Sequence, residues 1–143
     1  MARRRLVGVL VLAVIALSAC GTATAAKGKD VPPGRVERVH GSAQRRVILS
    51  AAAVRRLGVE EVPIASAAGG GTVVPYAAVI YDPSGKAWVY GRVKPRSYQR
   101  ERITVDRIDG DQAYLSAGPA VGTQVVSTGA AEVYGTEFFS DHE

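Results

Sequence analysis

Hydrophobic and polar residues alternate with a period of two along much of the second half of the chain. The clearest case is residues 76–93, where the segments "YAAVIY" and "KAWVYGRV" are rich in β-branched and aromatic residues. Between them lies Asp82-Pro83-Ser84-Gly85, which has the order that a type I turn favours: Asp first, Pro second and Gly fourth. The pattern therefore predicts a β-hairpin.

Alternation along the second strand of this hairpin separates two faces of a sheet. Trp88, Tyr90 and Arg92 share one face, and the other face carries small or aliphatic residues. The two aromatic side chains could form a platform for a ligand, although such a pair more often covers a second packed surface. Trp88, Tyr90 and Arg92 are the candidate contacts to a partner protein.

Further strands are expected after this hairpin. Residues 98–107 alternate between polar positions and the pair Ile103 and Val105, and "DGD" then leads into "QAYLS". This arrangement predicts a second hairpin. Another strand is expected over residues 123–127, and a turn over residues 130–134.

A short helix is expected at "AAAVRRL", after the strand candidate "RVIL" and before the extended segment "VEEVPI". Ser50 is a good N-cap, and Gly58 occupies the C-cap position. Arg55 and Arg56 lie in the last turn, where cations complement the helix dipole. This role is favoured for them over contact with a partner.

The N-terminal residues have the pattern of a secretory signal. Arginines at positions 3–5 precede an apolar run over residues 6–17, which is shorter than the ~20 residues of a membrane-spanning helix. Small residues at positions 18 and 19 precede Cys20, the single cysteine of the chain. "LSACG" resembles a bacterial lipobox, which implies cleavage before Cys20 and a lipid attached to its sulfur. The alternative is an ordinary cleaved signal followed by a coincidental cysteine.

The chain is predicted to consist of a lipoprotein signal peptide (1–19), a lipid-anchored flexible tether (20–45) and one β domain (46–139). Residues 22–44 show neither hydrophobic period and contain "PPG" and "GS", which is typical of a tether. Within the domain, "ASAAGGGT" at residues 65–72 is predicted to be a flexible loop.

Composition and charge narrow the class of protein. The chain has 143 residues, 47% of them hydrophobic, with 16 Gly and 7 Pro, which favours one small, turn-rich and mainly β domain. Its net charge is +5, but three of the basic residues belong to the predicted signal, which leaves about +2. A nucleic-acid-binding domain would keep its basic surplus in the folded part, so nucleic acid is not an expected partner.

The sequence offers no set of residues for catalysis or metal binding. His40 falls in the predicted tether and His142 almost at the C-terminus, and no metal-ligand, nucleophile or phosphate-loop motif is present. Asp106, Asp109 and Asp111 lack the spacing of a calcium loop and fit a hairpin turn better. We therefore expect a protein that is not an enzyme and that binds no cofactor and no metal.

A series of positions from residue 74 onward forms a recognisable order. They are Val74-Pro75, Ala78-Val79, Gly85, Trp88-Val89-Tyr90, Tyr98, Val105, Asp109-Gly110, Gly118, Gly122, Val125-Val126 and Gly129-Ala130. In this order they resemble the C-terminal part of the periplasmic adaptor subunits of bacterial efflux systems. These adaptors are the membrane fusion proteins (HlyD type) of tripartite systems of the resistance-nodulation-division (RND) type. "VILSAAAVRRLGVEEVPI" also resembles the segment that opens the same membrane-proximal domain in that family.

The resemblance implies a small barrel or β-roll of the permuted SH3-like type, with one short helix. In the family, the chain leaves this domain to build a lipoyl-like domain and an α-helical hairpin, and residues 65–72 stand where that excursion would be. The implied function is a non-catalytic, lipid-anchored adaptor on the extracytoplasmic face of the cell membrane that docks on an efflux permease. Homo-oligomerisation is left open. The alternative is an envelope lipoprotein that binds a ligand or a cell-wall polymer through its β surface, without a link to transport.

Overall fold

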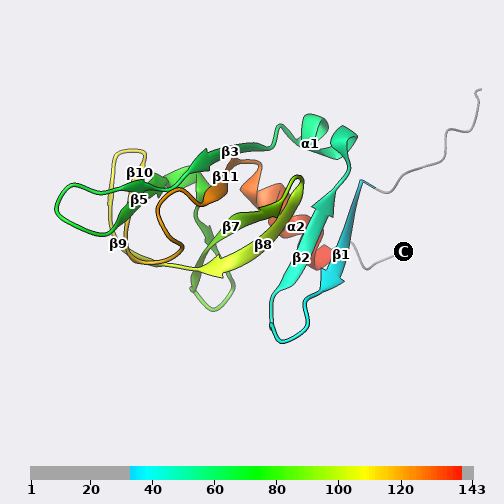
Figure 1. Cartoon of the computed structure of the whole chain (residues 1–143), viewed down its shortest axis with the longest axis horizontal. Helices are drawn as coiled ribbons and strands as arrows, with labels where there is room; N and C mark the ends of the chain where they lie inside the picture. Colours follow the sequence, from blue (N-terminus) through cyan, green and yellow to red (C-terminus); the bar gives the residue numbers. More distant parts are fainter. Residues whose placement is uncertain (1–32, 140–143) are drawn as a thin grey trace, which may run out of the picture. The chain divides into compact units, whose positions relative to one another are not determined.

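A computed structural model describes residues 33–139. These residues form two antiparallel sheets, two α-helices and a single-turn 3-10 helix (Figure 1). Sheet A has the order β1 (Gly34–Arg38), β2 (Arg45–Leu49), β8 (Ser97–Arg102), β7 (Ala87–Lys94), β11 (Gln124–Thr128) and β3 (Glu60–Pro63), with β6 (Ile80–Tyr81) also paired to β7. Sheet B has the order β4 (Ala65–Ser66), β5 (Thr72–Pro75), β10 (Gln112–Ala117) and β9 (Thr104–Asp109). The helices are α1 (Ala51–Leu57), η1 (Tyr76–Ala78) and α2 (Ala130–Phe139).

The predicted mainly β fold class is confirmed, and within residues 33–139 the strands form two sheets and no closed barrel. The chain changes sheet at Ile103, which separates β8 in sheet A from β9 in sheet B. Ile103 is only 2% exposed, and its N–H donates to the Ala87 carbonyl over 3.1 Å. The continuous strand expected over residues 98–107 is therefore two strands joined at a buried corner.

The segments on either side of the glycine-rich loop fold into one unit. From the first segment, β2 pairs with β8 and β3 pairs with β11. Across the loop itself, β4 and β5 form a short hairpin. The N–H of buried Ile64, just before the loop, donates to the Thr123 carbonyl over 2.9 Å. Residues far apart in the sequence thus hold the two ends of the loop close together.

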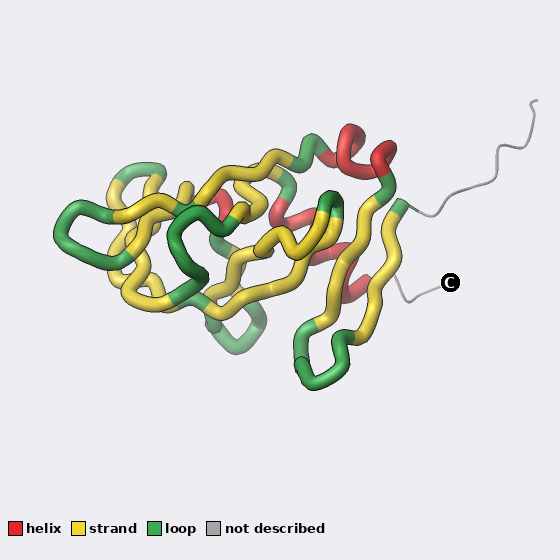
Figure 2. The backbone as a smooth tube through the Cα atoms, in the orientation of Figure 1, coloured by secondary structure: helices red, strands yellow, loops and turns green. Residues whose placement is uncertain are grey.

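Two hydrophobic cores lie on opposite faces of sheet A. The sheet–sheet core fills the space toward sheet B and contains Ile64, Val74, Ala78, Val79, Ala87, Val89, Ile103, Ala113, Leu115 and Val125. The helix–sheet core lies beneath α1 and α2 and contains Val47, Leu49, Ala53, Tyr90, Tyr98, Val126, Ala130 and Val133. In Figure 2, α2 runs across the strands of sheet A, and it contacts β1, β2, β6 and β7. Burial of this apolar area, at roughly 25 cal/mol per Å², is the main force that stabilises the arrangement.

The predicted tether is wrong at its C-terminal end. Residues 34–38 form β1, which pairs antiparallel with β2 in a register from Gly34 opposite Leu49 to Arg38 opposite Arg45. This edge strand carries exposed charged residues on both sides of Val36, a composition typical of protected sheet edges that is easily mistaken for a linker. Residues 39–44 form the connection between β1 and β2, and Arg45 begins β2. Residues 20–32 of the predicted tether and the signal peptide lie outside the described residues.

The predicted caps of α1 and the predicted turn after β6 are confirmed. The Ser50 hydroxyl accepts from the Ala53 N–H over 3.0 Å, and Gly58 is left-handed with φ 62°. At the turn, the Asp82 carboxylate accepts from the Ser84 hydroxyl, the Lys86 N–H and the Trp88 indole. These bonds, led by the one from Ser84, hold the pKa of Asp82 well below its usual range.

Candidate functional site

Two of the three predicted partner contacts on β7 are buried. Tyr90 is 0% exposed and Trp88 is 9% exposed, because α2 and the side chains of β8 cover this face of sheet A. The alternation predicted from the sequence is correct, but the face that carries these aromatic residues is a packed surface. The expectation that Trp88 and Tyr90 contact a partner is therefore wrong.

The buried Tyr90 side chain contacts a carboxylate supplied by α2. The Tyr90 hydroxyl donates to Glu137 Oε2 over 2.6 Å, and Arg100 Nε lies 2.8 Å from the same oxygen. The Arg100 guanidinium also stacks near Trp88 and Phe138, 4.7 and 4.8 Å from the ring centres. Burial, reinforced by the Glu137 carboxylate, raises the pKa of Tyr90 far above its usual range. The Tyr90 hydroxyl therefore stays protonated. Through Glu137, the hydrogen bond from Tyr90 and the ion pair with Arg100 connect α2 to β7 and β8 of sheet A.

Arg92, the third predicted contact, is accessible. Its side chain is 41% exposed, and Nη1 lies 3.0 Å from Glu61 Oε2 on β3. The other oxygen of Glu61 accepts from the Tyr98 hydroxyl over 2.9 Å. Burial raises the pKa of Tyr98, so its hydroxyl also stays protonated and donates to Glu61. Arg92 is thus partly exposed, and its ion pair with Glu61 links β7 to β3.

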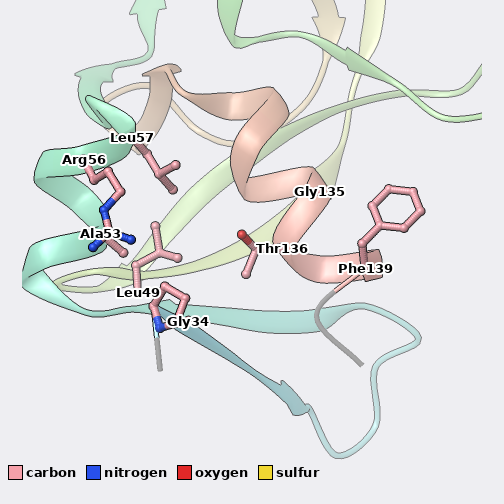
Figure 3. A pocket seen from close by; sticks show the side chains of 9 residues that line it. Gly34, Leu49, Ala53, Arg56, Leu57, Gly135, Thr136 and Phe139 are labelled. Carbon is pink, nitrogen blue, oxygen red and sulfur yellow. The ribbon is translucent and has the colours of Figure 1, made fainter. Parts of the chain in front are cut away.

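A groove of about 390 Å³ opens between α1 and α2, at the start of β1 (Figure 3). We call it the α1–α2 groove, and it is lined by Pro33, Gly34, Leu49, Ala53, Arg56, Leu57, Gly135, Thr136 and Phe139. In Figure 3, Leu57 on α1 and Leu49 on β2 point toward α2, which presents Thr136 to them. The lining is mostly apolar, with one cationic side chain, Arg56. This composition suits an amphiphilic ligand or an apolar segment of a partner.

Four cationic side chains lie on α1 and at the β7–β8 end of sheet A. Arg55 and Arg56 lie in the last turn of α1, Lys94 ends β7, and Arg96 lies in the turn between β7 and β8, but only Arg56 lines the groove. None of these four side chains forms an ion pair with another residue in the range 33–139. Arg96 lines a second hollow that shares Gly34 and Leu49 with the groove. Arg35 and Ile48 also line this second hollow, and they alternate with Gly34 and Leu49 along β1 and β2, so it opens on the face of these strands that is opposite α2.

The sequence contained a partial signal for this groove. Only a turn was predicted over residues 130–134, whereas α2 continues to Phe139. The residues at helical spacing are Ala130, Val133, Tyr134 and Phe138, but Glu137 interrupts the apolar stripe. Because Glu137 is buried against Arg100, which is distant in the sequence, its place in the core could not be read from the local pattern.

The predicted lipid attachment site, Cys20, lies outside the described residues. Between residues 33 and 139, no three His, Cys, Asp or Glu side chains lie close enough together to hold a metal ion. In the same range, neither α-helix is long and apolar enough to cross a bilayer.

Comparison with known proteins gave no match to this chain among protein-family models, curated proteins or solved structures.

Proposed function

We propose that this chain is a non-catalytic, lipid-anchored adaptor that docks on an efflux permease of the RND type, on the extracytoplasmic face of the cell membrane. The observation that carries the proposal is the joint folding of the two segments that resemble the adaptor family. Strands β2 and β3 come before the glycine-rich loop, and their partners β8 and β11 come after it. A family domain that is assembled from two separated segments requires this kind of pairing.

The loop between the two segments supports the same proposal. Residues 67–71 connect β4 to β5, and Gly69, Gly70 and Gly71 all have positive φ, which glycine adopts without steric cost. Because the strand ends on either side already lie side by side, a short loop can replace a long excursion at little entropic cost. This arrangement supports the proposal of an adaptor reduced to its membrane-proximal domain.

The anchor would supply most of the affinity for the membrane-bound partner. A lipid on Cys20 and the connection to β1 would confine the domain to a thin layer above the bilayer, which raises its effective concentration beside a permease. The contact itself can then be small. Arg92 remains the accessible member of the predicted contacts, and its neighbours Val93 and Lys94 are exposed.

Three measurements test the proposal. The full chain should partition into the detergent phase, and Cys20→Ala should move it to the aqueous phase. Crosslinking in intact cells should recover a polytopic permease, and deletion of the gene should raise sensitivity to an exported compound. Unchanged partitioning of the Cys20→Ala variant would remove the anchor. An unchanged sensitivity profile with no permease among the crosslinked proteins would remove the adaptor role.

A ligand-binding envelope lipoprotein is the second candidate, and the observation in its favour is the α1–α2 groove. The β surface that was expected to bind the ligand does not favour this candidate, because Trp88 and Tyr90 are buried. Recovery of a soluble envelope ligand, in the absence of a crosslinked permease, would favour this candidate over the adaptor.

A further inference from the structure

We propose that the free edge of β1 pairs with the β1 edge of a second copy of this chain, so that two domains share one continuous sheet. The inference goes beyond the proposed function and does not depend on the adaptor role. In Figure 1, β1 forms the outer edge of sheet A, and among residues 33–139 its one partner strand is β2. Its other edge therefore carries backbone groups that no strand of the described chain pairs.

The hydrogen bonds around β1 show which backbone groups lie at the free edge. The Ser50 N–H donates to the Pro33 carbonyl over 3.0 Å, so this carbonyl points toward β2. The neighbouring Leu49 N–H donates to the Arg96 carbonyl, on the far side of β2 from β1. Direction alternates from residue to residue in an antiparallel ladder. The residues whose N–H and C=O groups point to the free side are therefore Gly34, Val36 and Arg38.

A two-fold axis at Val36 pairs the whole of β1 with its copy. In that register, Val36 lies opposite Val36 of the second copy, and Gly34 lies opposite Arg38. The free N–H and C=O groups of these residues then exchange hydrogen bonds in both directions, as a two-fold interface requires. Arg35 and Glu37 fall in the alternate positions, where opposite side chains approach each other most closely.

The charges of β1 match in this register. Arg35 of each copy lies opposite Glu37 of the other, so each cation faces an anion. Both side chains are exposed, and within one chain Arg35 Nε lies 3.0 Å from Glu37 Oε1. Opposite charges directly across a strand pair stabilise it, whereas like charges destabilise it. Moving the axis by one residue places Arg35 opposite Arg35, or Glu37 opposite Glu37, so the charges select one register.

The other sheet edges of the described chain do not match themselves in this way. The two registers that pair five of the six residues of β9 place Asp106 opposite Asp106, or Arg107 opposite Arg107. Strand β3, at the far edge of sheet A, ends in Pro63, which has no N–H to donate. Strand β4 has two residues. Among the described edges, β1 is therefore the one that fits a second copy.

Apolar surface lies near the start of this edge. Gly34 and Val36 share the face of β1 that points to α2, since a Cβ on Gly34 would meet Thr136. Phe139 ends α2, lines the same groove as Gly34 and is 68% exposed. A second copy would bring its own Val36 to this face. An exposed aromatic ring near an unpaired strand edge is typical of an interaction surface.

The self-matching charges favour a second copy over an unrelated peptide. Any extended peptide could use the free backbone groups of β1, but it would need an anion and a cation in the same order to match Arg35 and Glu37. The pairing of five residues is short, so we expect a weak dimer in dilute solution. Attachment of both copies to one bilayer, as in the proposed function, would raise their effective concentration and favour pairing.

Disulfide crosslinking in intact cells that express the full chain tests the register. Val36→Cys places two cysteines opposite each other, with Cα atoms about 5.5 Å apart, which is within the range of a disulfide. Arg38→Cys is the matched control, because the two copies of residue 38 lie about 13 Å apart along the strands. An oxidant should give several-fold more covalent dimer from Val36→Cys than from Arg38→Cys. The original chain, with Cys20 as its single cysteine, gives the background.

Charge reversal tests the recognition. Two differently tagged copies of the full chain are expressed together, and the fraction that co-purifies is measured. Arg35→Glu in both copies, or Glu37→Arg in both, should lower this fraction about tenfold, because two opposite-charge pairs become like-charge pairs. Arg35→Glu in one copy and Glu37→Arg in the other should restore it, and so should both substitutions in every copy. Arg38→Glu, which would face Gly34, should change it little.

Three results would overturn the proposal: equal dimer from Val36→Cys and Arg38→Cys, no recovery in the mixed charge-reversed pair, or a Val36→Cys adduct with a different protein in place of a dimer. Circular dichroism of each variant excludes loss of folding as the cause. The outcome is separable from that of the proposed function. A dimer without a crosslinked permease would leave this inference standing and refute the adaptor role, and a recovered permease without a dimer would do the reverse.

Discussion

The Tyr90 hydroxyl donates a 2.6 Å hydrogen bond to Glu137, and both side chains are almost completely buried, with exposures of 0% and 1%. This contact joins the central strand β7 to the last turns of α2. Arg100 on β8 neutralises the carboxylate from 2.8 Å. A helix of ten residues is too short to be stable alone, so its position depends on these contacts and on the apolar residues beside them.

Glu137→Ala should destabilise the domain by about 3–5 kcal/mol, because it leaves Arg100 largely buried without its counter-charge and Tyr90 without its acceptor. Urea unfolding monitored by Trp88 fluorescence measures the loss. Glu132→Ala, on the exposed side of the same helix, is the control and should cost less than about 1 kcal/mol. Equal losses in the two variants would mean that the buried ion pair does not hold α2.

Tyr90→Phe should cost about 1–2 kcal/mol, since it removes one of the two donors to the buried carboxylate while it preserves the ring. Combined with Glu137→Gln in a double-mutant cycle, it should give a coupling of about 1 kcal/mol. The control pair is Tyr90→Phe with Glu132→Gln. If the two cycles give the same coupling, the 2.6 Å contact has no energetic counterpart.

The sequence predicted correctly those elements that depend only on residues close together along the chain. The turn at Asp82-Pro83-Ser84-Gly85, the caps of α1 and the two faces of β7 follow from neighbouring residues, and the structure contains all three. The extent of α2 depends instead on Glu137, whose burial becomes favourable only when Arg100 and Tyr90 meet it.

Two other errors have the same origin in long-range contacts. Strand β1 carries mostly charged residues and is held by its pairing with β2, so the sequence looked like a tether. Ile103 fits the alternation of a continuous strand, yet the chain passes from sheet A to sheet B at this residue. Its side chain is buried in the sheet–sheet core, among residues that are distant in the sequence. The α1–α2 groove is assembled from residues more than 80 positions apart, such as Leu49 and Thr136, and no local pattern predicts it.

Gly135→Ala should stabilise the domain by about 1 kcal/mol. Gly135 lies within α2, has no positive φ, and an added Cβ would meet no atom within 4 Å. Glycine in a helix loses about this much free energy relative to alanine. The gain is read from the urea midpoint at constant slope. Gly58→Ala, at the left-handed C-cap of α1, is the contrasting substitution and should destabilise. A loss at Gly135 would show that α2 needs flexibility at the groove.

Glu101→Gln should stabilise the domain at neutral pH and have little effect at about pH 4. The Glu101 carboxylate lies where a Cβ on Gly91 would be, and its partial burial raises its pKa above the ordinary value of 4.5. The folded state therefore holds this proton more tightly than the unfolded state does. That contribution is complete below the unfolded pKa and is lost as the pH rises through the folded pKa.

Urea unfolding of the Glu101→Gln variant and the original chain, measured from about pH 4 to 7, tests this sign. The two free energies of unfolding should diverge as the pH rises. Thr104→Ser, which alters an exposed position on β9 and removes no titratable group, should give a curve parallel to that of the original chain. Parallel curves for Glu101→Gln as well would mean that burial of this carboxyl has no effect on its proton affinity in the folded state.

An insertion of five Gly and Ser residues after Gly70 should cost only about 1–2 kcal/mol. Doubling the loop adds about 0.6 kcal/mol of closure entropy, and the hydrogen bonds of the turn between Ala67 and Gly71 are also lost. The pairing of β3 with β11 and of β5 with β10 lies outside the loop and is unaffected. The same insertion between Pro95 and Arg96 should cost more, because it breaks the tight turn that sets the register of β7 and β8 and ties Arg96 to Leu49.

Urea unfolding compares the free energies of unfolding of the two insertion variants. If the insertion after Gly70 were the more damaging one, the two segments would depend on their short link to find each other. In the adaptor family, further domains are inserted at the position of this loop, so the two segments must fold together without a short connection between them. Strong destabilisation by the insertion after Gly70 would therefore argue against the adaptor resemblance.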